Sequence, residues 1–171
     1  MVLAGILDSP WIRAPLVIIL ALAIQTGVVA SFRPFDVTPD LMLLLAVAGG
    51  LVLGPERGAI TGAAIGFLFD LVLSTPFGLS ALVYGLAAFA VGLVSVGTLR
   101  ASKWVPVLLV TSASAAAVVL YAVLASVFGL ERAVTLRLVP TVFVVATVNG
   151  LLAVPAMAVM RWTMHADERR T

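Results

Sequence analysis

The sequence predicts an all-α membrane protein, a single polytopic bundle of about six transmembrane helices. Of its 171 residues, 63% are hydrophobic and only 11% are charged, whereas a soluble domain carries roughly 25% charged residues. The charged residues also cluster, which leaves long charge-free stretches between them. A chain of 171 residues is normally one domain, so we expect residues 1–171 to form one membrane bundle.

The predicted spans follow from the charge-free stretches. They cover residues 14–32, 40–54, 58–73, 78–99, 104–129 and 138–160. Most reach the roughly 20 residues that crossing a bilayer requires, but the second and third are shorter. Residues 54–58 between these two read Gly-Pro-Glu-Arg-Gly, a run rich in turn formers, which predicts two short helices in a tight hairpin. The alternative is one re-entrant hairpin that does not cross.

The first span is expected to be retained in the mature protein. Val28-Val29-Ala30 resembles a signal-peptidase site. However, the apolar run at 14–32 is longer than the roughly 7–15 residues of a signal-peptide core.

The distribution of basic residues predicts the orientation. An even number of spans puts both termini on one side, together with the second and fourth loops. That side holds seven of the ten Lys and Arg residues: Arg13, Arg57, Arg100, Lys103, Arg161, Arg169 and Arg170. The other side holds Arg33, Arg132 and Arg137. Because basic loops stay in the cytoplasm, both termini are predicted to be cytoplasmic. Trp11, Trp104 and Trp162 fall at the cytoplasmic ends of spans, where indole rings anchor at the headgroups.

Residue chemistry argues against an enzyme. The chain has no cysteine, which excludes disulfides, iron–sulfur clusters and thiolate zinc sites. Its one histidine, His165, lies in the C-terminal tail. No nucleophile–base pair, phosphate-binding loop or metal-ligand cluster is recognisable, so we predict no catalytic residue and no cofactor. The net charge of +2 is better explained by membrane orientation than by nucleic-acid binding.

The strongest internal pattern is a four-residue ladder of small and polar residues. Its members are Gly50, Gly54, Gly58, Gly62, Gly66, Asp70, Ser74 and Gly78. In the third span, Gly58, Gly62 and Gly66 share one helix face, and small residues at this spacing let two helices approach closely in lipid. The partner helix can belong to this chain or to another protein. We therefore take Gly58, Gly62, Gly66, Asp70, Pro76 and Gly78 as helix-packing and partner-binding candidates.

Asp70 is an ionisable residue within a predicted span. A carboxylate inside the bilayer costs about 2.5–3.5 kcal/mol even on insertion scales, so it needs a partner or a position near the interface. Three roles stay open from the sequence: a structural role, in which Asp70 caps the turn that follows or pairs with an Arg, binding a partner protein, and ion or proton transport. Asn149, in the middle of the last span, predicts an interhelical hydrogen bond.

Residues 39–92 resemble a known family. The motifs are Pro39-Asp40-Leu41 before a short apolar span, the turn at 54–58, the run GAAIGFLFD at 62–70, and TPFGLSAL at 75–82 with Tyr84. Together they resemble the rod-shape-determining MreD family. Members have a similar length and span number, a glycine-spaced helix that ends in an acid, and a Pro-x-Gly-Leu turn.

This resemblance implies a non-enzymatic scaffold in bacterial cell elongation, in the cytoplasmic membrane. The expected partners are an MreC-like protein with one span, the actin-like MreB filament, and the glycosyltransferase and penicillin-binding transpeptidase that build lateral peptidoglycan. It also implies a bundle similar to the substrate-binding subunits of energy-coupling-factor transporters. A vitamin-transporter subunit is therefore the alternative, but the first span lacks the Ala-x-x-x-Ala motif of those subunits.

The predicted topology can be tested with reporter fusions. Fusions after Asp36 and after Glu131 should report an outside location, and fusions at Ser102 and at the C-terminus an inside location. An outside signal at Ser102 would mean that the second and third spans form one re-entrant hairpin.

Overall fold

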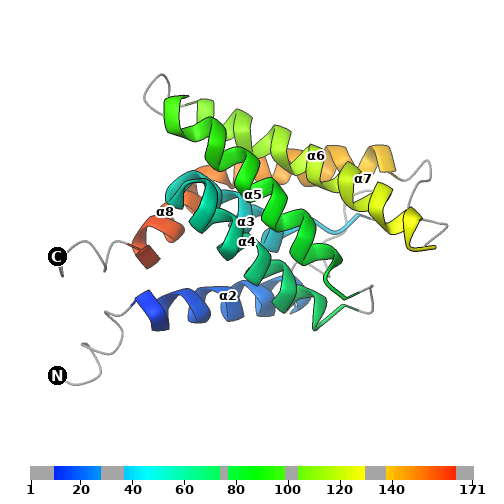
Figure 1. The fold of residues 1–171 in the computed structure, drawn as a ribbon, viewed down its shortest axis with the longest axis horizontal. Helices are drawn as coiled ribbons and strands as arrows, with labels where there is room; N and C mark the ends of the chain where they lie inside the picture. Colours follow the sequence, from blue (N-terminus) through cyan, green and yellow to red (C-terminus); the bar gives the residue numbers. More distant parts are fainter. Residues whose placement is uncertain (1–9, 28–36, 74–76, 99–103, 130–137, 165–171) are drawn as a thin grey trace.

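The computed structural model describes residues 10–27, 37–73, 77–98, 104–129 and 138–164, and these residues form helices and short turns without a strand (Figure 1). The predicted all-α class is therefore confirmed for the described residues. The helices are α2 (Pro10–Gly27), α3 (Leu41–Leu53), α4 (Pro55–Asp70), α5 (Leu79–Thr98), α6 (Val105–Val127), α7 (Leu138–Leu151) and α8 (Ala153–Met164).

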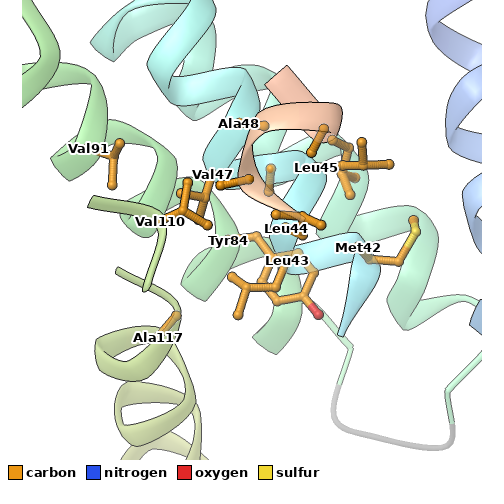
Figure 2. Close-up of a cluster of buried hydrophobic side chains, with 14 of the residues drawn as sticks. Met42, Leu43, Leu44, Leu45, Val47, Ala48, Tyr84, Val91, Val110 and Ala117 are labelled. Carbon is orange, nitrogen blue, oxygen red and sulfur yellow. The ribbon is translucent and has the colours of Figure 1, made fainter. Parts of the chain in front are cut away.

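Helix α3 is the centre of the bundle. Every residue from Met42 to Leu51 is buried, because α4, α5, α6, α8 and α2 all pack around it. A helix that is apolar on all sides is typical of such a central position. Figure 2 shows Met42, Leu43 and Val47 of α3 in one cluster with Tyr84 of α5 and Val110 of α6.

The predicted hairpin between the second and third spans is present. Helices α3 and α4 are linked by Gly54 alone, whose φ of 81° lies in the left-handed region that favours glycine. Helix α4 begins at Pro55, earlier than the predicted start at 58, because proline is well suited to the first position of a helix. It ends at Asp70 rather than at residue 73, and Leu71 and Val72 form a turn.

The predicted last span, 138–160, is bent in the structure. It consists of two helices, α7 and α8, which are bent by 58° at Leu152. The bend lies between Gly150 and Pro155, the two residue types that most often interrupt a transmembrane helix.

The length of the helices bears on how many of them cross a bilayer. Among the described residues, α6 is the one helix that is long and apolar enough by itself, and α7 with α8 qualifies if the bent pair is one span. Apolar but shorter helices cover Ile12–Gly27, Leu41–Leu53 and Leu79–Ser95. The six-span count stays a prediction.

The two ends of the bundle can be distinguished. The start of α2 and the end of α8 meet, since the Arg13 guanidinium stacks 4.7 Å from the centre of the Trp162 ring and donates to the Trp162 carbonyl at 3.4 Å. Figure 1 shows these two helix ends together at one extremity. We call this extremity the inner end, after the orientation predicted from the sequence. The opposite one, with the start of α3, the end of α4 and the start of α5, is the outer end.

Candidate functional site

Asp70 closes the outer end of the α4–α5 pair. Its side chain is only 1% exposed. Oδ2 accepts from the backbone N–H groups of Gly78 at 3.0 Å and Ala81 at 3.3 Å, and Oδ1 accepts from that of Ser80 at 3.2 Å. The first N–H groups of a helix have no partner within the helix, and a carboxylate there also interacts favourably with the helix dipole. Asp70 therefore caps α5 from the end of α4, which is the capping role left open by the sequence.

The candidate glycines of α4 pack against the same chain. A Cβ added at Gly58 would lie 2.6 Å from the Cα of Gly50 in α3, and one at Gly62 would lie 2.7 Å from the carbonyl oxygen of Tyr84 in α5. A Cβ at Gly66 would collide with the backbone of Ser80. These contacts are closer than any side chain permits, so glycine sets the distance between the helices.

The remaining candidates lie around the connection between α4 and α5. Gly78 has a φ of 91°, a conformation that suits glycine, and its N–H is the one bonded to Asp70. Pro76 falls outside the described residues, as do Ser74 and His165. The structure thus brings Gly66, Asp70 and Gly78 together at the outer end, whereas Gly58 lies near the inner end, next to Gly50.

A second carboxylate organises the start of α3. Asp40 is the N-cap of α3: Oδ1 accepts from the Leu43 N–H at 2.9 Å, while Oδ2 accepts from the Tyr84 hydroxyl at 2.5 Å. Gln25 of α2 holds the backbone beside it. The Gln25 amide donates to the Pro39 carbonyl and accepts from the Leu41 N–H, both at 2.8 Å.

Neither Gln25 nor the Asp40–Tyr84 bond was expected from the sequence. Gln25 is 6% exposed and is the one buried side chain described in α2. An amide within the apolar run at 14–32 was the available signal, since a polar group in a span needs a partner.

These polar groups border a cavity of about 520 Å³ at the outer end. Its wall combines Gln25 and Thr26 of α2, the start of α3, the end of α4, the start of α5, and parts of α6 and α7. Apolar members include Leu43, Val83 and Val118, and polar members include Ser80 and Tyr84. A mostly apolar wall with a few hydrogen-bonding groups, in this range of volume, is typical of ligand sites.

A buried amide links α6 and α7 away from this cavity. Asn149 donates to Ser114 Oγ at 3.0 Å, and both residues are fully buried. The Asn149 Oδ1 has no hydrogen-bond partner in the described part of the chain. The pair is the interhelical hydrogen bond that Asn149 predicts.

The surface near the connection is aromatic. The exposed rings of Phe67 and Phe77 meet edge to face, with centroids 5.3 Å apart. Leu71 and Val72 are exposed beside them in sequence. Within the described ranges, no group of three or more His, Cys, Asp or Glu side chains is placed to hold a metal ion.

A comparison with protein-family models decides the family. The model described as rod shape-determining protein MreD matches residues 8–163. The chain belongs to the MreD family. Neither the curated proteins nor the solved structures include a match to this chain. MreD proteins are membrane-associated structural proteins that determine rod shape together with MreB and MreC, and they are not known as enzymes. The family expected from the motifs at 39–92 is therefore confirmed.

The glycine contacts predict a graded loss of folding. Gly66→Leu and Gly62→Leu should both lower the amount of folded protein in the membrane, because each Cβ meets rigid backbone of α5. Even Gly66→Ala should be destabilising, by about 1–3 kcal/mol, as expected for overpacking. Gly27→Ala is the control, because no atom lies within 4 Å of its added Cβ. Membrane level and thermal unfolding in detergent measure the effect; normal values for both leucine variants would contradict the packing.

Asp70 variants should separate capping from charge pairing. Asp70→Leu leaves three N–H groups without their acceptor and should lower the free energy of unfolding by about 1–3 kcal/mol. Asp70→Asn keeps one acceptor oxygen and should lose less than half as much. Thermal unfolding of the purified variants is the measurement. An equally large loss in both would indicate that the charge, rather than the cap, is what matters.

Proposed function

We propose that this chain is a non-enzymatic membrane scaffold of the bacterial cell-elongation complex. It spans the cytoplasmic membrane about six times with both termini in the cytoplasm. It links an MreC-like partner and the peptidoglycan synthases, a glycosyltransferase and a penicillin-binding transpeptidase, to cytoplasmic MreB filaments. Membership of the MreD family supports the role in rod shape. The vitamin-transporter alternative has no support from the family comparison.

The observation that carries the partner-binding proposal is the Asp70 cap. Three hydrogen bonds fix the start of α5 relative to the end of α4. The close contacts at Gly62 and Gly66 hold the same two helices together. A surface supported in this way is rigid before it meets a partner, so little conformational entropy is lost on binding.

We place the MreC-like partner on α4, α5 and their connection at 73–79. The exposed side chains there include Phe67, Leu71 and Phe77. Aromatic anchors of this kind dominate the binding energy of many interfaces. The glycines themselves are turned toward α3 and α5 of this chain, so the partner meets the opposite, larger side chains of α4. Asp70 acts here as a positioning residue for the surface.

Partner binding can be tested with two matched phenylalanines. Phe77→Ala should lower co-purification of the MreC-like partner about tenfold, as loss of roughly 1.4 kcal/mol implies. Phe143→Ala is the control, because Phe143 of α7 is 66% exposed and Phe77 is 63% exposed. Both should be compared at equal membrane levels. Asp70→Leu should lower binding as well. Rod-shaped cells and full partner recovery with Phe77→Ala and with both Asp70 variants would show that this surface is not the contact.

A further inference from the structure

The hydrogen bonds around the cavity leave a particular set of polar groups for a ligand. The backbone N–H groups of Leu41 and Leu43 are bonded to Gln25 and Asp40. Those of Ser80 and Ala81 are bonded to Asp70. These amides are therefore not available to hydrogen-bond the backbone of an inserted peptide. Polar residues of the cavity wall include Ser80 and Tyr84, and the Tyr84 hydroxyl donates to Asp40, which leaves its oxygen as an acceptor.

The described residues of the cavity wall also offer no free charge. Asp40 is the one carboxylate among them, and both of its oxygens already accept hydrogen bonds within the chain. No basic side chain is among these described wall residues. A phosphate or carboxylate headgroup would find no counter-charge among them, and its desolvation costs several kcal/mol. An uncharged group with hydroxyl or ester oxygens would find donors and acceptors without this cost.

Helix α2 gives this cavity a wall that faces lipid. Leu16, Ile19 and Leu20 are among its exposed side chains, about half to two-thirds accessible. Its one buried side chain is Gln25, whose two bonds at 2.8 Å join α2 to the residues on either side of Asp40. Breaking these two bonds would remove the Gln25 contacts between the outer part of α2 and the start of α3, while leaving the Arg13–Trp162 contact at the inner end.

From these observations we propose that the cavity at the outer end is a binding site for an uncharged amphiphile of the bilayer, of the diacylglycerol class. The ligand enters past α2 when the two Gln25 hydrogen bonds, which we call the Gln25 clamp, open. The acyl chain lies along Leu43, Val83 and Val118. The headgroup hydroxyl donates to the Tyr84 oxygen, whose own proton goes to Asp40, and an ester oxygen accepts from the Ser80 hydroxyl. The placement in the outer leaflet rests on the proposed topology.

A photolabelling experiment tests the site. The full chain is reconstituted in nanodiscs of phosphatidylethanolamine and phosphatidylglycerol with a diacylglycerol that carries a diazirine at the end of one acyl chain. We expect cavity residues such as Leu43 and Val118 to be labelled about fivefold more than the exposed Leu108 of α6. Phosphatidylglycerol with the same labelled chain should show no such preference, which distinguishes headgroup chemistry from general lipid contact.

Variants show whether the label reports the cavity. Val118→Trp should fill it and reduce cavity labelling at least about fivefold, whereas Leu108→Trp on the same helix should not. Ser80→Ala removes a headgroup partner without filling space and should reduce labelling about threefold. Its control is Ser112→Ala, because the Ser112 hydroxyl bonds within its own helix. Since Ser80→Ala keeps the N–H that Asp70 caps, it stays informative even if Val118→Trp does not fold.

The Gln25 clamp is tested with one variant and one matched control. Gln25→Leu should speed cavity labelling about threefold, because both hydrogen bonds to the start of α3 are lost. Thr61→Val in α4 should leave the rate unchanged, since Thr61 lies outside the cavity wall and its hydroxyl bonds to a carbonyl of α4 itself. Unchanged labelling in Gln25→Leu would overturn the entry route.

Three other outcomes would overturn the site itself. These are labelling spread evenly over α6, equal labelling by the charged lipid, and a cavity that stays unlabelled but cross-links to a segment of the MreC-like partner in the complex. Reporter fusions that contradict the topology would move the cavity to the other leaflet without changing the labelling map. A wrong topology and a wrong binding site therefore give different experimental results.

Discussion

The arrangement of this bundle depends on one buried carboxylate. Asp70 at the end of α4 accepts hydrogen bonds from three N–H groups at the start of α5, and these bonds join two helices that run in opposite directions at their outer ends. A charge in an apolar setting is stable only when its lone pairs are filled. Here the donors are the N–H groups at the start of α5, which themselves need an acceptor. The Asp70 side chain therefore satisfies the N–H groups of α5 while its own buried oxygens are satisfied by them.

Close approach of the helices is the second requirement. The cap reaches Ser80 and Ala81 only because α4 lies against α5 with no side chain between them, which Gly62 and Gly66 permit. In lipid, the drive for helix association comes from packing and hydrogen bonds, so contact distance matters more than apolar area. Gly50 and Gly58 extend the same principle to α3 and α4. The glycines and the acid thus act together, and neither explains the geometry alone.

Much of this could be predicted from the sequence, and the misses have physical causes. Charge-free runs locate helices well, because charges are excluded from spans. They cannot locate a bend such as that at Leu152, where the chain stays apolar on both sides. The four-residue spacing identifies the packing face of α4, but not which helix it meets. Gln25 was missed because its role depends on the backbone of residues 39 and 41, which are distant in sequence from α2.

The two sides of α4 differ in what they contact. The face with Gly62 and Gly66 is occupied by this chain's own α5, so it is not available to a partner. The face with Ile60 and Phe67 is exposed and carries bulky apolar groups that in a membrane meet lipid or another helix. Because the buried face sets the position of the exposed one, the proposed partner surface would respond to a change at Asp70 through displacement of α5 and the connection. In this proposal the glycine ladder supports the interface without forming it, since the exposed face lies about a half-turn away around the helix.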